Sequence, residues 1–191
     1  MPDESLPIIQ EWFNEYDFHL RISKSRSSKY GDFRPAYRNQ PNRISVNGDL
    51  NQYHFLLTLT HEVAHAAVWK QYKNRVNPHG KEWKGKYAEL LTELMLLVVF
   101  PKDLKQAIDL HLQRPKASSC NDPELYKTLK KYDAKENIIY LEDIPENSSF
   151  LVQGKRKFIK GKKRRTRFEC IEIGTKKTYL ITGHSEVELL S

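Results

Sequence analysis

The 191-residue sequence predicts an α+β protein in two parts. Apolar residues recur at helical spacing in several segments of the first 113 residues, and the apolar period changes to two after Ile138. Residues 114–119, Arg-Pro-Lys-Ala-Ser-Ser, lie between these regions and are typical of a linker. We therefore expect a domain of helices packed on a small sheet over residues 1–118, and a basic, β-rich module over residues 119–191.

The first elements of the N-terminal domain follow from local patterns. Residues 6–17 place apolar side chains at helical spacing, which predicts a first helix that covers the core. Residues 18–23 alternate between apolar and polar side chains and favour a half-buried strand. Residues 43–47 are a second strand candidate, which ends at the turn Asn47-Gly48-Asp49. A later helix is expected over residues 104–111, after Pro101.

The central helix is predicted between Leu50 and Asn74, where neither glycine nor proline interrupts the chain. It carries the sequence H-E-x-x-H, at His61-Glu62-Val63-Ala64-His65. Because an α-helix has 3.6 residues per turn, the two histidines fall one turn apart on one face, where both imidazoles can reach a single ion. Glu62 lies beside that face, where its carboxylate can accept a proton from the attacking water. This spacing on a helix is the signature of zinc hydrolases.

A pair of core histidines with a solvated glutamate is the alternative interpretation of this helix. The alternative is disfavoured because a buried helix would then carry polar groups that lack partners, which is costly.

A third zinc ligand is expected downstream. The metzincin pattern needs glycine at position 68 and histidine at position 71, but the chain has Val68 and Gln71, so that class is excluded. Asn77-Pro78 predicts a turn and a helix start, which puts His79 at the entry to a helix that continues through Leu94. His79 is preferred because three neutral imidazoles leave a strongly Lewis-acidic ion. The competing ligands are glutamates of the same helix: Glu82, Glu89 and Glu93.

Two motifs together resemble the SprT-like metalloproteases, which are relatives of the Spartan proteases. The motifs are Thr58-Leu59-x-His61-Glu62-x-Ala64-His65-Ala66 and His79-Gly80-x-x-Trp83, and the resemblance covers roughly residues 10–100. It implies a zincin-like catalytic domain in which His61, His65 and His79 bind Zn²⁺ and Glu62 is the general base. Many members of the family carry a C-terminal zinc ribbon with four cysteines. This chain has only Cys120 and Cys170 and cannot form one.

Composition indicates a soluble globular protein, with 39% hydrophobic and 29% charged residues. The longest apolar run, residues 94–100, is too short to span a bilayer. Residues 1–5 lack the features of a signal peptide, and two cysteines agree with a reducing compartment. We therefore expect a cytoplasmic protein with no membrane partner.

Residues 43–47 are the candidate for substrate binding, because zinc proteases hold an extended substrate by strand addition beside the active helix. An ordinary structural strand is equally compatible with these residues. A basic region surrounds this strand, since residues 21–43 contain seven lysines and arginines and a single acid, Asp32. Aromatic residues are interleaved, which is compatible with a nucleic-acid surface and also with a solvated basic hairpin.

The C-terminal module is predicted to be an antiparallel meander. Its strand candidates, which are separated by turn residues, are 138–141, 150–152, 157–159, 167–173 and 177–181.

A dense run of positive charge lies within this module. Nine cations with no acid between them are expected to contact nucleic acid: Lys155, Arg156, Lys157, Lys160, Lys162, Lys163, Arg164, Arg165 and Arg167. The chain has a net charge of +8, so this segment accounts for its whole basicity. Such a density predicts a polyanionic partner, although a basic loop that only aids solubility is the simpler alternative. DNA is favoured over RNA through the resemblance to Spartan-like proteases.

These residues and the resemblance predict a zinc-dependent endopeptidase that cleaves proteins associated with DNA. The alternative is a non-proteolytic DNA-binding protein with a structural or idle zinc site. Glu62 argues against the alternative, because structural zinc needs no base and normally has a fourth protein ligand.

Overall fold

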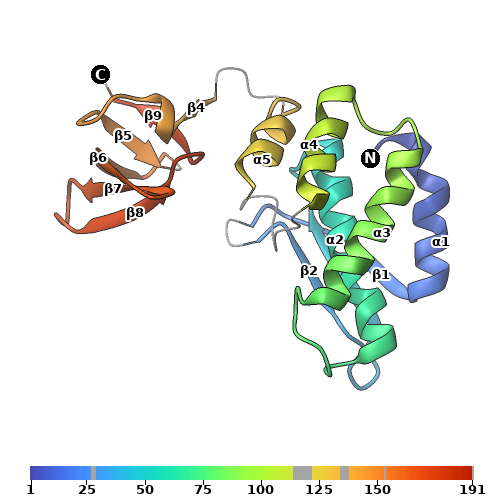
Figure 1. Ribbon diagram of the computed structural model, residues 1–191. Coiled ribbons are helices and arrows are strands. Elements are labelled where there is room, and N and C mark those ends of the chain that lie inside the picture. The colour runs from blue at the N-terminus through green and yellow to red at the C-terminus, as the bar shows by residue number, and fades with distance from the viewer. Residues whose placement is uncertain (27–28, 114–121, 134–137, 153, 191) are drawn as a thin grey trace. The chain divides into compact units, whose positions relative to one another are not determined.

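The computed structural model describes residues 1–26, 29–113, 122–133, 138–152 and 154–190. It shows an α+β protein, as the sequence predicts, with five α-helices and two sheets in these ranges. The chain divides into two compact units, Met1–Asp133 and Ala134–Ser191 (Figure 1). The expected linker at residues 114–119 and Cys120 lie outside the described residues. No helix within the described ranges is both long and apolar enough to cross a membrane.

The first unit contains five helices and a three-stranded sheet. In chain order these are α1 (Leu6–Tyr16), β1 (Phe18–Ser23), β2 (Gly31–Arg34), β3 (Asn42–Asn47), α2 (Gln52–Tyr72), α3 (Lys81–Leu96), α4 (Lys102–Gln113) and α5 (Pro123–Lys130). A 3-10 turn, Asp3–Ser5, precedes α1. The strand order is β1-β3-β2, with β3 parallel to β1 and antiparallel to β2. Helix α2 packs on β2 and β3 and also contacts α1 and α3, so it lies at the centre of the unit.

Helix α2 is the predicted central helix. Asn51 caps its start, because the Asn51 side chain accepts hydrogen bonds from the backbone N–H groups of Tyr53 and His54. Leu56, Leu59 and other apolar residues around the helix are fully buried. Burial on several faces agrees with the apolar pattern, and it fixes the direction in which the polar residues of α2 point.

The expectation for residues 43–47 is wrong in one respect, because β3 is the central strand of the sheet. It pairs with a neighbour on each side, and Ile44 and Val46 are fully buried. A strand paired on both sides has no free backbone groups for strand addition. The edge strand that contacts α2 is β2, Gly31–Arg34, which the sequence pattern did not reveal.

The first unit extends further along the chain than the expected boundary between residues 118 and 119. Helix α5 lies beyond that boundary, yet it packs on α4 and places Leu125 and Leu129 in the same core as α2. Asn51 Nδ2 donates to the Leu129 carbonyl over 2.9 Å, and His111 Nδ1 lies 2.8 Å from Asp122 Oδ2 at the start of α5. These contacts make α5 part of the helical unit.

The second unit is the predicted antiparallel module. Its strands are β4 (Ile139–Tyr140), β5 (Ser149–Val152), β6 (Arg156–Arg164), β7 (Arg167–Glu172), β8 (Thr178–Thr182) and β9 (Glu186–Leu189). Their order is β4-β9-β5-β6-β7-β8, so β5 to β8 form a meander and β9 returns to pair with β5. A small core, which includes Phe150, Phe158, Phe168 and the thiol of Cys170, lies on one face.

Candidate metal centre

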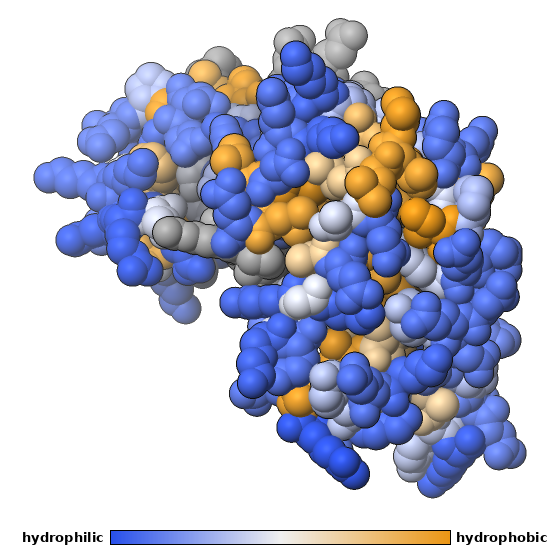
Figure 2. All heavy atoms as spheres, turned by 45° about the vertical axis from the view of Figure 1, so that its right-hand side comes forward, coloured by the Kyte–Doolittle hydropathy of each residue, from blue (hydrophilic) through white to orange (hydrophobic). Residues whose placement is uncertain are grey.

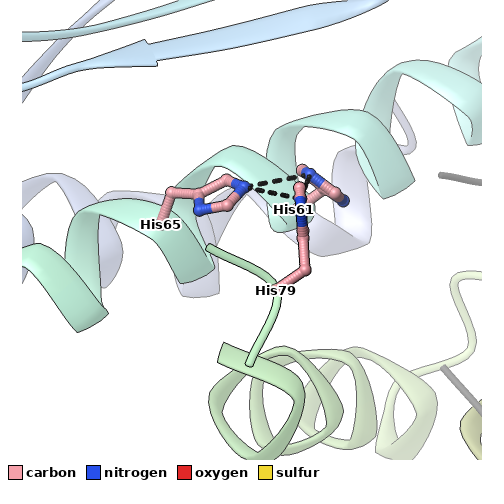
Figure 3. A group of neighbouring side chains, drawn as sticks. All are labelled: His61, His65 and His79. Atoms are coloured by element: carbon pink, nitrogen blue, oxygen red, sulfur yellow. Dashed lines mark hydrogen bonds between the residues drawn. The ribbon is translucent and has the colours of Figure 1, made fainter. Parts of the chain in front are cut away.

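Three histidines from two places in the first unit converge on one point. His61 and His65 lie one turn apart on α2, as their spacing predicts, and His79 lies directly before α3 (Figure 3). The backbone of His79 has a φ of 58°, in the left-handed region, and Gly80 then caps α3. This tight entry to α3 turns the His79 ring back toward α2.

The distances between the three rings fit a metal ligand set. The Nε2 atoms of His61 and His65 are 3.2 Å apart, those of His65 and His79 are 3.0 Å apart, and those of His61 and His79 are 3.2 Å apart. A tetrahedral zinc ion with Zn–N distances of about 2.0–2.1 Å separates two nitrogen ligands by about 3.3–3.4 Å. The observed triangle is therefore close to one face of such a tetrahedron, and these three residues could hold a metal ion.

Burial keeps the three imidazoles in the form that binds metal. It lowers the pKa of His61 well below its ordinary value of 6.5, and the neighbouring histidines add to this effect. Burial lowers the pKa of His65 to about 4 and also lowers the pKa of His79. All three rings are therefore neutral near pH 7. With the proton of each ring on Nδ1, three nitrogen lone pairs face a common centre.

Trp83 supports the cluster from behind. Its indole is completely buried, and its ring centre lies 4.6 Å from that of His61 and 4.7 Å from that of His79. Tyr87 stacks on the other side of the indole, with ring centres 4.9 Å apart. The sequence showed Trp83 only as part of a motif. Its physical role is to fill the space behind two ligands and restrict their rings.

Glu62 follows His61 on α2, and its side chain faces strand β2 of the sheet. Only 7% of the residue is exposed, and its carboxylate accepts a hydrogen bond from the backbone N–H of Phe33 in β2. Burial, together with the nearby Asp32, raises the pKa of Glu62 to about 8, although the Phe33 N–H, Lys29 and Arg26 act in the opposite direction. A cation held by the histidines would lower this pKa, because it favours the carboxylate form.

Strand β2 approaches Glu62 so closely that Gly31 has no room for a side chain. A Cβ atom at Gly31 would lie 2.5 Å from Glu62 Oε1, 2.7 Å from Glu62 Cγ and 2.8 Å from Thr58 Cγ2. Gly31 is therefore part of the site, because its lack of a side chain leaves the space that Glu62 occupies. Glycine in a strand can mark a place where another part of the chain approaches closely, and Gly31 was the available clue in the sequence.

Residues 8–99 match the family model described as the SprT-like family. We refer to residues 8–99 as the SprT-like region. A comparison with curated proteins and one with solved structures each found no match. The SprT-like region spans the sheet, α2 and α3, and it includes the three histidines and Glu62.

The competing glutamates of the SprT-like region have other surroundings. Among the described residues, the metal-binding group consists of His61, His65 and His79 alone. Glu89 pairs with Lys86 over 2.7 Å, and Glu89 and Glu93 line a hollow between α1 and α3. The structure thus brings His79, and none of these glutamates, to the two histidines of α2.

The sequence-based prediction of a zinc hydrolase can be tested at Gly31. Replacing Gly31 with alanine should then reduce hydrolytic turnover at least about tenfold and leave zinc content unchanged. The added Cβ displaces the Glu62 carboxylate, and its three nearest neighbours are atoms of Glu62 and Thr58 and not of the imidazoles. Small misplacements of a reacting group cost large factors in rate. The measurements are the turnover number and the metal content of the purified variant. Gly85→Ala is the matched control, because a Cβ there meets nothing within 4 Å. Full turnover in Gly31→Ala would show that the carboxylate position is not critical.

The basic segment of the second unit, residues 155–167, does not form one uniform surface. Lys160 is 3% exposed, and its Nζ donates to the carbonyl oxygens of Ile144, at 2.5 Å, and Glu142, at 3.3 Å. This placement contradicts the expectation that Lys160 contacts nucleic acid. The physical reason is the strand period of two, which puts Lys160 on the same inner face as Phe158.

Two other cations of the segment are engaged by acids on β7. Arg156 Nε lies 2.7 Å from Glu172 Oε1, and Arg164 Nε lies 2.8 Å from Glu169 Oε1. The remaining six are exposed: Lys155, Lys157, Lys162, Lys163, Arg165 and Arg167.

Proposed function

We propose that this protein is a zinc-dependent endopeptidase with a zincin-like catalytic domain. His61, His65 and His79 hold the ion, and Glu62 is the general base. The observation that carries the proposal is the convergence of three Nε2 atoms within 3.0–3.2 Å, next to a buried carboxylate on the same helix. The match of residues 8–99 to the SprT-like family model supports the same function.

Each residue of the site has a defined task. A bound zinc ion supplies a Lewis acid that polarises the scissile carbonyl and lowers the pKa of water. Glu62 accepts a proton from the attacking water and passes it to the leaving amine. The Phe33 N–H holds the Glu62 carboxylate in place while it carries out both transfers.

The substrate backbone is aligned by β2. The Tyr30 carbonyl accepts a hydrogen bond from the Asn47 N–H at the end of β3. Because backbone groups alternate in direction along a strand, those of Gly31 and Phe33 point to the opposite, open edge. The Phe33 N–H on that edge is the group that binds Glu62, which places the edge directly beside the general base. An extended polypeptide that adds to β2 therefore passes the catalytic residues.

Metal-dependent cleavage of an unfolded protein tests the proposal. Wild-type protein loaded with one zinc per chain should cleave denatured casein into peptides. A chelator should stop the cleavage, and added zinc should restore it, because the ion cannot be replaced by any side chain of the site. The measurement is peptide release followed by mass spectrometry. If the zinc-loaded protein cleaved no unfolded substrate, the proposal of an endopeptidase would be wrong, and the metal centre would have a role in binding only.

The proposed substrates are proteins associated with nucleic acid, with DNA preferred to RNA. Six exposed cations on β6, β7 and their adjoining turns support this partner. The other basic region is less available, because Arg26 donates to Asn47 and Ser45 of β3, and Lys29 pairs with Asp32 over 2.6 Å.

Salt dependence measures how many of these cations reach phosphates. Each phosphate neutralised on duplex DNA contributes about −0.9 to the slope of log affinity against log salt concentration. Replacing three exposed residues, Lys162, Lys163 and Arg165, with serine should flatten the slope by up to about 2.7. Zinc content and cleavage of a short peptide should not change. Replacing Arg21, Lys24 and Arg38 is the matched control, since these three cations are also exposed. A slope that collapses only in this control would place the nucleic-acid surface on the SprT-like region.

A further inference from the structure

A hollow lies between α1 and α3, outside the metal centre. Its volume is about 350 Å³, which is within the range of ligand pockets. Its apolar lining comes from Ile8 and Trp12 of α1 and from Leu96 and Leu97 at the end of α3. We call it the α1–α3 groove.

The apolar lining continues onto the surface. Leu96 is 82% exposed, and Val98, two residues further along the chain, is 92% exposed. The side that carries α1 in Figure 1 comes forward in Figure 2, where hydrophobic side chains gather in a patch bordered by hydrophilic ones. Large apolar side chains grouped at a hollow are typical of a docking surface for another polypeptide.

The charge around the α1–α3 groove is negative, although the chain as a whole carries +8. Four carboxylates line it, Glu11 and Glu15 from α1 and Glu89 and Glu93 from α3, and no lysine or arginine does. Two lysines lie next to the lining. Lys86 pairs with Glu89, and Lys70 donates to the Glu15 carbonyl and lies over the Tyr16 ring, which leaves the four carboxylates in excess. Acids around a hollow with apolar walls focus a negative potential, which favours a cationic occupant.

We propose that the α1–α3 groove binds a lysine- or arginine-bearing segment of the polypeptide substrate. This inference rests on the proposed function and adds a substrate class to it. The aliphatic stems of lysine and arginine pack on apolar lining such as Leu97, and their charged ends reach the surrounding carboxylates. Leu96 and Val98 contact apolar residues of the same segment.

The groove lies within reach of a substrate held at the metal centre. Glu89 and Glu93 follow His79 by 10 and 14 positions (89 − 79 and 93 − 79), which corresponds to about 15–20 Å along a helix. An extended chain covers this distance with roughly five or six residues at about 3.3 Å each. A substrate of about twelve residues can therefore bind both places, whereas a short peptide cannot.

Peptide binding tests the groove without cleavage. The probe is a fluorescent peptide of alternating lysine and leucine, and the protein is the Glu62→Gln variant. Reversing two charges with Glu11→Lys and Glu93→Lys should weaken binding by about tenfold or more, which is 1.4 kcal/mol. The matched control reverses Asp109 and Glu124, which are exposed acids outside the groove. Its affinity should stay within about twofold of the parent protein.

The apolar part has its own pair of variants. Leu96→Ser should weaken binding of the same peptide, whereas Leu110→Ser on α4, a leucine that is 58% exposed, should not. With active protein, the groove variants should raise KM for a long basic substrate and leave the kinetics of a short peptide unchanged.

Three results would overturn the proposal. If an acidic peptide of alternating glutamate and leucine bound as tightly as the lysine–leucine peptide, the carboxylates of the groove would not select a cationic segment. Equal affinity in the parent and in the groove variants would place the peptide elsewhere. If light scattering showed that the wild-type protein is a dimer and the charge-reversed variant a monomer, the occupant of the α1–α3 groove would be a second copy of this chain. Groove-dependent binding by a protein that never cleaves would instead retain the groove and refute the proposed function.

Discussion

Replacing His79 with alanine should leave the purified protein with little bound zinc. Two imidazoles on one helix would remain, and the third corner of the Nε2 triangle would be lost. The loss of affinity should exceed the ~10–100-fold associated with losing an outer-shell partner of a metal ligand. Zinc per chain by elemental analysis and a competition assay with a chelating dye measure this effect.

Two controls make the His79 result specific. His19→Ala removes an exposed histidine of β1, and Glu82→Ala removes the competing carboxylate nearest to His79 in the sequence. Both variants should retain one zinc per chain. If Glu82→Ala loses zinc and His79→Ala keeps it, the third ligand is the glutamate.

Replacing Glu62 with glutamine should abolish most of the hydrolysis and retain the metal. Glutamine keeps the size and can still accept the hydrogen bond from the Phe33 N–H, but it cannot take a proton from water. Loss of a general base costs about 10²–10⁴-fold in rate. Turnover of a long peptide and zinc content, measured on the same preparation, separate catalysis from metal binding.

The stability of the same variant gives an independent check. Burial disfavours the charged form of Glu62, as its raised pKa shows, so a neutral amide should leave the melting temperature equal or higher. Cleavage at the wild-type rate by a zinc-loaded Glu62→Gln preparation would point to another base or to a contaminating protease.

The metal centre could be predicted largely from sequence, because most of its geometry is local. The spacing of His61 and His65 on an uninterrupted helix already puts both rings on one face. His79 follows after a short turn, so its return to α2 needs little long-range information. Strand β2 gave no such signal, because it is only four residues long and has a single large apolar side chain, Phe33. Its position depends on pairing with β3, and local sequence does not encode that pairing.

In the second unit, the prediction failed at a pattern that is local. The cations of residues 155–167 were interpreted as one surface, although alternate residues of a strand face opposite sides. Phe158 and Lys160 are two residues apart, so in a strand they share a face, and this was available from the sequence. Burial of a lysine next to an aromatic core is uncommon and was therefore not expected. Strand β9 was also missed, since only Val187 among its four residues is buried.

The left-handed turn at His79 has a consequence for the fate of the protein in a cell. His61 and His65 belong to α2 and His79 precedes α3, so an ion bound by all three joins the two helices across residues 73–80, as a covalent cross-link would. Metal binding then adds to folding stability, by about 1.4 kcal/mol for each tenfold excess of free zinc over its dissociation constant. When zinc is scarce, this connection between the two helices would be lost, and the less stable chain would be more open to degradation. The abundance of the protein should therefore rise and fall with the zinc supply.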